Sequence, residues 1–191
     1  MTIDLGQKNM QNKSILARAL LLTCICSAFV ASQSYSEQPR PNILLIMAED
    51  MSSRVGVFGD EVAQTPNIDA LARKGTKYTN VYTTAGVCSP SRAAQILGVH
   101  QISTGAQHMR TRYFKASSYR SVPPSNIKAY PEILRANGYF TFVVNKLDYQ
   151  FSDVSVRSGP FTIWDHESSK VAWGKRSKNQ PFFGFVTFYE T

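Results

Sequence analysis

Two adjacent carboxylates, Glu49 and Asp50, follow an apolar run near the start of the chain, "PNILLIM" at residues 41–47. A continuous apolar run is typical of a strand buried on both faces of a parallel sheet, so the carboxylates should lie where that strand ends. Hard carboxylate oxygens at such a turn are ligands for Ca²⁺ or Mg²⁺. A solvated loop pair without an ion is the alternative, because acidic residues are common on surfaces.

The segment "CSPSR" places Cys88 and Arg92 at the expected start of a helix. Ser89 is suited to the N-cap, Pro90 to the first helical position and Gly98 to the end of the helix. Free N–H groups and the helix dipole at that end favour an anion, and they should lower the pKa of the Cys88 thiol. Arg92, one turn further, carries a planar fork suited to sulfate or phosphate. A buried, unreactive cysteine and a surface arginine are the alternative.

Lys146 and Asp148 come directly after a second strand-like run, "YFTFVV" at residues 139–144. The lysine could bind an anionic group, and the aspartate could act as metal ligand, base or orienting acceptor. An ordinary exposed loop is the alternative. His108, close to two arginines in "HMRTR", is a candidate substrate contact, although a lone histidine is more often structural.

Strand-like and helix-like segments alternate, which predicts an α/β fold with a mostly parallel central sheet flanked by helices. In such sheets ligands bind outside the carboxyl ends of the strands, where the candidate residues fall. The last strand-like run ends at Thr191, so we expect a sheet that is incomplete at its C-terminal side and a longer parent protein. Residues 145–179 are expected to be irregular. The remaining predicted strands are 77–83 and 181–189, and the remaining predicted helices are 65–75 and 130–138.

The first 32 residues have the pattern of a secretory signal peptide. Basic residues precede the apolar run "ALLLTCICSAFVA", and small residues in "VAS" offer a cleavage site after Ser32. A retained membrane anchor is one alternative, but the run is shorter than the roughly 20 residues that span a bilayer. A lipoprotein signal at Cys24 is another, although Thr23 is a poor residue before a modified cysteine. We therefore predict a signal peptide at 1–32, a linker at 33–40 and a truncated catalytic domain at 41–191, in a secreted or periplasmic protein without stable membrane insertion after cleavage.

Cleavage would change both the charge and the cysteine content of the 191-residue chain. The net charge is +8, and residues 1–32 contribute a net +2, so +6 would remain. Two of the three cysteines would be removed, leaving Cys88 without a disulfide partner in an exported protein, which requires an explanation. The positive charge favours an anionic ligand or polymer. No nucleic-acid motif is present, so nucleic acid is not an expected partner.

Five segments match one known family in order along the chain. They are "PNILLIMAED", "FGDEVAQTPNIDALARKGTKYTNVYT", "CSPSR", "GYFTFVVNK" and "PFFGFVTFYET". Cys-x-Pro-x-Arg is a sulfatase signature, and the set resembles the N-terminal portion of the type I, formylglycine-dependent sulfatases. The resemblance covers about residues 41–191 and implies the alkaline-phosphatase-like fold.

The resemblance also implies a mechanism. A formylglycine-generating maturation enzyme would oxidise Cys88 to Cα-formylglycine. One hydroxyl of its hydrate would attack the sulfur of a sulfated carbohydrate and displace the alcohol, and the second hydroxyl would then help to expel sulfate as the aldehyde reforms. Ca²⁺, or Mg²⁺ instead, would be held by Glu49, Asp50 and modified Cys88. Arg92 would hold the formylglycine, and Lys146 would contact the sulfate. A phosphoryl or phosphonate ester hydrolase of the same superfamily and an inactive truncated fragment are the alternatives.

Two positions depart from the family's usual pattern. Glu49 stands where an aspartate is usual, and a longer carboxylate side chain can still bind Ca²⁺. Asp148 stands where the family usually has a histidine that contacts a formylglycine hydroxyl, so the role of Asp148 stays open. The next catalytic histidine and the later metal ligands of the family would lie beyond Thr191.

Overall fold

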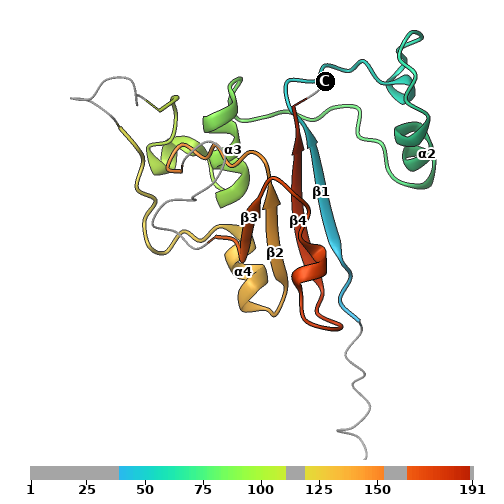
Figure 1. The fold of residues 1–191 in the computed structure, drawn as a ribbon. Helices are drawn as coiled ribbons and strands as arrows, with labels where there is room; N and C mark the ends of the chain where they lie inside the picture. The colour runs from blue at the N-terminus through green and yellow to red at the C-terminus, as the bar shows by residue number, and fades with distance from the viewer. Residues whose placement is uncertain (1–38, 111–118, 153–162, 190–191) are drawn as a thin grey trace, which may run out of the picture. The chain divides into compact units, whose positions relative to one another are not determined.

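The computed structural model describes residues 39–110, 119–152 and 163–189 (Figure 1). The chain divides into two compact units, 1–40 and 41–191, and only the second is described in any detail. The predicted signal peptide and most of the predicted linker therefore lie outside the described residues. Among the described residues, no helix is long and apolar enough to cross a membrane.

Four parallel strands form the sheet, in the order β1-β4-β2-β3 (Figure 1). The strands are β1 (Ile43–Ala48), β2 (Phe140–Val144), β3 (His166–Ser168) and β4 (Phe182–Phe188). The parallel α/β architecture predicted from the alternating pattern is thus confirmed. The strand β3 lies in a stretch that was expected to be irregular, because three residues are too few to show a periodic pattern.

The last strand of the chain, β4, lies between the first strand and the middle one. Its residue Phe185 is paired with Leu45 of β1 on one side and with Val143 of β2 on the other. The strand β4 is buried along most of its length, as its apolar run predicts. The prediction that β1 is buried on both faces is wrong for the described residues. β1 is an edge strand with β4 as its one neighbour, and three of its apolar side chains are exposed: Ile43, Leu44 and Ile46.

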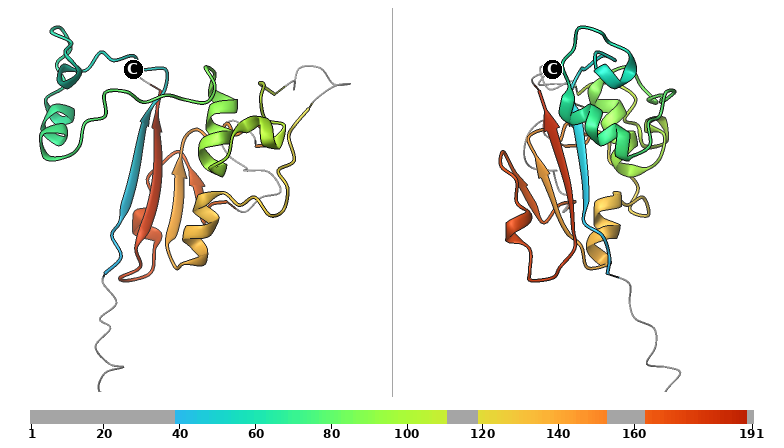
Figure 2. Two further views of the ribbon diagram at one scale, coloured as in Figure 1. Left: turned by 180° about the vertical axis from the view of Figure 1, so that it is seen from behind. Right: turned by 90° about the vertical axis from the view of Figure 1, so that its right-hand side faces the viewer.

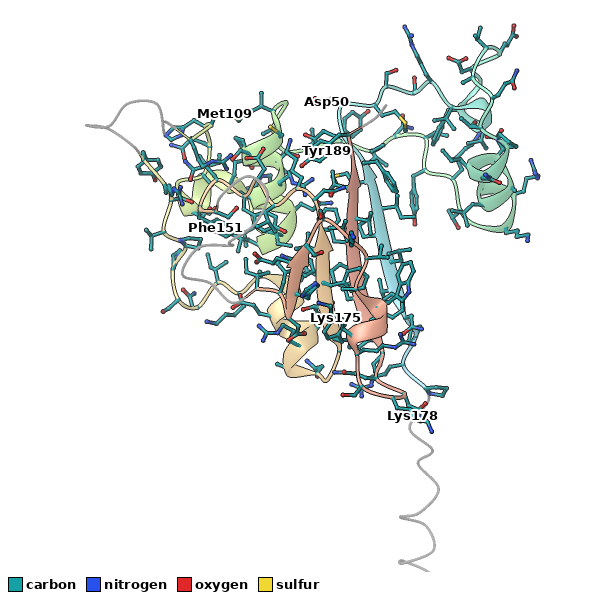
Figure 3. All side chains as sticks on the ribbon, in the orientation of Figure 1. Asp50, Met109, Phe151, Lys175, Lys178 and Tyr189 are labelled. Atoms are coloured by element: carbon teal, nitrogen blue, oxygen red, sulfur yellow. The ribbon has the colours of Figure 1, made fainter. Side chains whose placement is uncertain are left out.

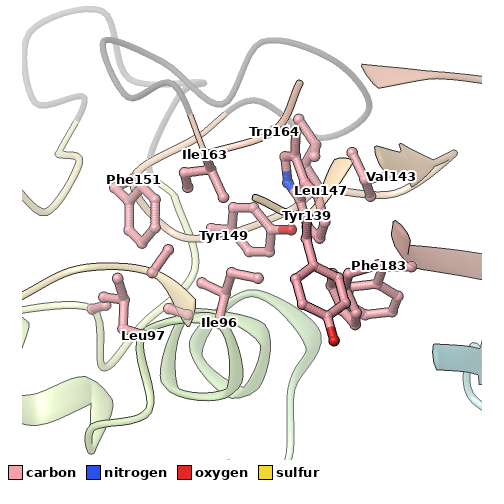
Figure 4. Packing of buried hydrophobic residues seen from close by; sticks show 14 residues of the cluster. Ile96, Leu97, Tyr139, Val143, Leu147, Tyr149, Phe151, Ile163, Trp164 and Phe183 are labelled. Carbon is pink, nitrogen blue, oxygen red and sulfur yellow. The ribbon is translucent and has the colours of Figure 1, made fainter. Parts of the chain in front are cut away.

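The helices α3 (Cys88–Leu97) and α4 (Tyr130–Ala136) lie on one face of the sheet, and the short helix η3 (Trp173–Lys175) lies on the other (Figure 2). Alternate residues of the strands therefore enter two different cores. The larger core joins Ile96 of α3 to Val143 and Phe185 (Figure 4). It also holds Tyr139, Leu147, Tyr149, Phe151, Ile163, Trp164 and Phe183. The smaller core, on the η3 face, holds Phe142, Val144, Ala172 and Val186.

The helix α2 (Pro66–Lys74) has the bounds that Thr65, Pro66 and Gly75 predict. The Thr65 hydroxyl does not cap its own helix. It accepts a hydrogen bond from the backbone N–H of Gly56 at 2.9 Å, and Asp69 accepts one from Val57 at 2.8 Å. These bonds attach α2 to the preceding short helix η1 (Gly56–Phe58).

Two local predictions are wrong. Residues 77–83 form no strand, because no neighbouring strand lies beside them in the described chain and side chains such as Tyr82 stay exposed. The helix α3 begins at Cys88 with Val87 as its N-cap, so Ser89 is a helical residue rather than the cap. Gly98 ends α3 as predicted, with a left-handed φ of 66°.

A substitution at Gly184 should test the close packing of the sheet. A Cβ built on Gly184 would lie 2.8 Å from Cε1 of Phe142, which is fully buried. We expect Gly184→Ala to lower the free energy of unfolding of the full-length protein by about 1–3 kcal/mol, because the buried ring cannot move away without a cost. Urea unfolding measures this change. Gly86→Ala is the control, since a Cβ there meets no atom within 4 Å. Equal stability of the two variants would contradict the packing described.

Candidate active site

The candidate residues meet where the strands end. Glu49 follows β1, Lys146 and Asp148 follow β2, and Cys88 is the first residue of α3. Figure 3 shows Asp50 and Tyr189, which follow β1 and β4, at the same edge of the sheet. This edge is where ligands bind in open α/β sheets, because loops rather than regular hydrogen bonds surround the strand ends.

Arg92 connects α3 to the loop that follows β2. Its side chain is 4% exposed. Nε donates to the carbonyl oxygen of Leu147 at 2.7 Å, and Nη2 donates to the carbonyl of Lys146 and to Oγ1 of Thr187 at 3.2 Å. The guanidinium also lies over the ring of Phe185, 5.0 Å from its centroid. In this structure Arg92 thus positions the loop that carries Lys146, and its catalytic role stays a prediction.

Lys146 lies between two carboxylates. Nζ donates to Oε1 of Glu49 and is 3.4 Å from Oδ2 of Asp148. Burial alone would lower the pKa of Lys146, but the hydrogen bond to Glu49 and the attraction of Cys88 and Asp148 outweigh it and raise the pKa. Lys146 is therefore a permanent cation at neutral pH. Glu49 has a second cationic neighbour, Nη1 of Arg92, at 3.8 Å.

The half-buried thiol of Cys88 is next to Asp148 and Lys146. Burial raises the pKa of Cys88, and the hydrogen bond with Asp148 and the negative charge of that carboxylate raise it further. The cation of Lys146 and the backbone N–H of Ser89 oppose the shift without cancelling it. The expectation that the start of the helix lowers the pKa of this thiol is therefore wrong. Desolvation and an adjacent anion outweigh the helix end, and the unmodified thiol is protonated at neutral pH.

Arg110 is part of the cluster, although the sequence did not single it out as a site residue. Its Nη2 forms a buried ion pair with Oδ1 of Asp148. Nη1 donates to Oγ of Ser89 at 3.2 Å and to the carbonyl of Tyr149 at 3.0 Å. Its neighbour His108 is exposed instead, and its ring lies 5.0 Å from that of Tyr119. Three basic residues stand close together in "HMRTR", and nothing local distinguishes the one that reaches Asp148.

The backbone of the site is held in sparsely populated conformations. Asp50, Asn145 and Asp148 have positive φ angles of 54°, 71° and 46°. Such conformations persist where surrounding bonds determine them, and they cluster at functional sites. Here Nδ2 of Asn145 donates to the carbonyl of Thr187 at 2.8 Å, which attaches the start of the loop to β4. The fold therefore forces the loop into the turn that brings Lys146 and Asp148 to Cys88.

A cleft of about 870 Å³ opens beside the cluster. Glu49, Asp50, Cys88 and Arg92 line it together with the extended segment 81–87. The carboxylates of Glu49 and Asp50 are oxygen donors of the kind that Ca²⁺ or Mg²⁺ takes. Within the described ranges, however, no group of three or more His, Cys, Asp or Glu side chains could hold a metal ion. Since Ca²⁺ takes about six to eight oxygens, these two residues supply only part of such a site.

The family comparison matches most of the chain. The sequence model of the sulfatase family matches residues 41–188. An ulvan-active sulfatase from Formosa agariphila is 42% identical over 156 residues, which cover 80% of this chain and 25% of that protein. The iduronate 2-sulfatase of Mus musculus is 34% identical over 171 residues, 86% of this chain and 30% of that protein. The chain thus spans about a quarter to a third of the length of these relatives.

Solved structures share the fold. A 2-O GAG sulfatase superposes with a TM-score of 0.59 at 20% identity, covering 79% of this chain and 35% of that one. The phosphonate monoester hydrolase of Agrobacterium radiobacter superposes with a TM-score of 0.59 at 16% identity, covering 79% and 41%. The parallel sheet with its polar site at the strand ends is therefore of the alkaline-phosphatase-like class. Within that class, the chain belongs to the sulfatase family and corresponds to its N-terminal portion.

Replacing Arg92 should destabilise the protein. Arg92→Lys cannot reach the carbonyls of Lys146 and Leu147 together, so at least one buried acceptor would lose its partner. We expect the free energy of unfolding to fall by about 2–4 kcal/mol, measured by urea unfolding of the full-length protein. Arg73→Lys on the exposed face of α2 is the control and should change stability by less than about 0.5 kcal/mol. Similar losses for both variants would contradict the role of Arg92.

The raised pKa of Cys88 predicts a slowly reacting thiol in the unmodified protein. Alkylation by iodoacetamide in EDTA should increase with pH, with a midpoint above the value of about 8.5 for a free cysteine, because only the thiolate reacts. Asp148→Asn should lower that midpoint, since it removes a charge that raises the pKa. Glu61→Gln, at an exposed carboxylate of another segment, should leave it unchanged. A parent midpoint below that of free cysteine would refute the assignment.

Proposed function

We propose that this chain is part of a longer protein that hydrolyses sulfate esters, with residue 88 as the source of the nucleophile. The observation that carries the proposal is the ion pair of Lys146 and Asp148 beside Cys88, at the first turn of α3, where both charges shift the pKa of the thiol. Membership of the sulfatase family supports the same reaction. A cation, a carboxylate and a reactive position within one cluster suit the transfer of an anionic group.

Each residue of the cluster has a proposed role. Modification of Cys88 to Cα-formylglycine would supply a geminal diol as nucleophile, and Ca²⁺, or Mg²⁺ instead, would supply a Lewis acid. Glu49, Asp50 and residue 88 would hold the cation, together with donors from the rest of the longer protein. The ammonium of Lys146 would bind a sulfate oxygen. Asp148 would hold a proton of the side chain at position 88, because it already accepts the hydrogen bond of the thiol.

A sulfated carbohydrate is the proposed substrate class. One relative is named an ulvan-active sulfatase. A structure with the same fold, at a TM-score of 0.57 and 21% identity, was solved with its substrate D-glucosamine-2-N,6-O-disulfate. The net charge of +8, of which +6 would remain after removal of residues 1–32, favours a polyanionic sugar. The signal-like segment at residues 1–32 supports export, which gives access to extracellular polysaccharides and requires a maturation enzyme for Cys88.

A phosphoryl or phosphonate ester hydrolase is the second candidate. The observation that favours it is the shared fold of the phosphonate monoester hydrolase. The cluster of Lys146 and Arg92 could face a phosphoryl group as well as a sulfate, because both are tetrahedral oxyanions. The family match favours sulfate as the leaving group.

Activity of the full-length protein tests the proposed function. Produced with a formylglycine-generating enzyme, the protein should release sulfate from a sulfated polysaccharide faster than phosphate from a matched phosphate ester. Residue 88 should be about 18 Da lighter than cysteine, the difference between a thiol and an aldehyde at this position. Cys88→Ala should abolish sulfate release. Full activity of a protein whose Cys88 remains a thiol would overturn the proposed nucleophile, and faster phosphate release would favour the second candidate.

Arg110 should affect kcat indirectly, because its ion pair positions Asp148. We expect Arg110→Gln to lower kcat by about 10- to 100-fold with a smaller effect on KM, because Asp148 loses its ion-pair partner while the substrate contacts remain. Arg110→Lys should recover part of the loss. Arg135→Gln is a matched control, since it removes another arginine–aspartate pair, with Asp165, at an exposed position. If Arg135→Gln lost as much activity as Arg110→Gln, a general loss of protein stability rather than the position of Asp148 would explain both results.

A further inference from the structure

We propose that the connection between β3 and β4 forms a second binding surface for a sulfated polysaccharide, separate from the candidate active site. We call it the basic surface and define it as Lys170, Trp173, Lys175, Arg176 and Lys178. The proposal rests on the proposed function for the identity of the polymer, but the surface itself rests on charge and geometry. None of these residues belongs to the catalytic cluster described above.

All charged side chains of this connection are basic. Residues 168–189 contain four basic side chains and no aspartate or glutamate. Lys170, Lys175 and Lys178 are exposed, and no ion pair involves them within the ranges that the structure describes. Here the ammonium groups are left for an external anion, and several within one short connection favour a polyanion over a single charged group.

The connection is attached to the body of the protein. Arg176 lies over the ring of Phe182, 5.4 Å from its centroid, and its Nη1 donates to the carbonyl of Trp173 at 2.6 Å. The buried Ala172 accepts a hydrogen bond from the backbone of Lys175, and Gln180 donates to the carbonyl of Gly138 at 3.1 Å. The lysines thus project from a fixed backbone, which lowers the entropic cost of binding a ligand.

An aromatic ring lies among these cations. Trp173 is 43% exposed, while its packed side contacts Phe142 and Phe182 with ring centroids 6.3 Å apart in each case. The remaining surface of the indole is open to solvent. A tryptophan that combines an apolar face with neighbouring donors suits a partner that is both apolar and polar, such as a sugar ring with sulfate groups. The exposed indole face therefore favours a polyanion that carries sugar rings over a simple inorganic polyanion.

The basic surface extends away from the candidate active site. Lys170 lies nearest to it, two residues after Ser168 of β3, and the connection then runs toward the opposite edge of the sheet. Figure 3 shows Lys178 at one end of the sheet and Asp50 and Tyr189 at the other. The strand β4 between these ends has 7 residues, so at about 3.3 Å per residue the ends are roughly 23 Å apart. A single sulfate ester cannot occupy both places. A polymer can, so the basic surface would retain the chain while one of its esters is hydrolysed.

Binding of dextran sulfate to the full-length Cys88→Ala protein tests the proposal. The parent should bind immobilised dextran sulfate but not uncharged dextran, with an affinity that falls as salt rises. The combined variant K170E/K175E/K178E should bind about tenfold or more weakly at low salt and show a weaker salt dependence. Three exposed basic residues elsewhere provide the control with the same change of charge: R54E/R73E/K128E should lose markedly less affinity. Equal losses of affinity in the two variants would show that binding depends on total charge, which would overturn the proposal of a localised binding surface.

Kinetics of the active protein separate this proposal from the proposed function. In K170E/K175E/K178E, KM for a sulfated polysaccharide should rise while kcat/KM for a small aryl sulfate stays unchanged. If the parent hydrolyses no sulfate ester, the proposed function is wrong. The binding measurement with dextran sulfate still tests the basic surface, because it does not depend on turnover.

Lysine labelling shows what covers the basic surface in the full-length protein. Acetylation followed by mass spectrometry should modify Lys175 and Lys178 in the free protein, and dextran sulfate should protect them. Unreactive lysines in the free protein would show that another segment of the longer chain covers the surface, which would overturn the proposal.

Discussion

The arrangement of the site depends on the buried guanidinium of Arg92. One side chain from α3 binds two consecutive carbonyls of the loop after β2 and a hydroxyl of β4. A buried charge is tolerated only when its hydrogen bonds are made, so the helix, the loop and the strand can take only arrangements that satisfy these donors. The position of Cys88 relative to Lys146 follows from this constraint, because Cys88 is one turn before Arg92 on the same helix.

The charges around Cys88 depend on one another. Glu49, Lys146, Asp148 and Arg110 form a chain of alternating sign, and the side chains of all four are at most 11% exposed. In such a chain each group is stabilised by its neighbours, and the loss of one leaves a desolvated charge behind. Burial and the adjacent carboxylate of Asp148 together raise the pKa of Cys88, so the thiol stays protonated at neutral pH. A protonated thiol is a weak nucleophile, so this environment does not favour attack by Cys88 as a thiolate.

The two ends of the parallel sheet offer different chemistry. The strand ends that carry Glu49 and Lys146 combine carboxylates with cations, which suits a reaction on an anionic group. The connection with Lys175 and Lys178 at the other end has cations without carboxylates, which suits binding without reaction. Because all strands run in one direction, the connection leaves β3 at the edge that carries the candidate active site and must cross to the opposite edge, where Lys178 lies, before β4 begins.

The sequence by itself determined the parallel α/β class, three of the four strands and the helices α2, α3 and α4, because apolar periodicity, prolines and glycines act locally. It also predicted that Glu49, Cys88 and Lys146 would meet, since strand ends and helix starts share one edge of such a sheet. Only the tertiary structure decided that Arg110 rather than His108 reaches Asp148, that β1 is an edge strand and that the pKa of Cys88 rises. Those outcomes depend on burial and on partners far apart in the sequence, and no local pattern encodes them.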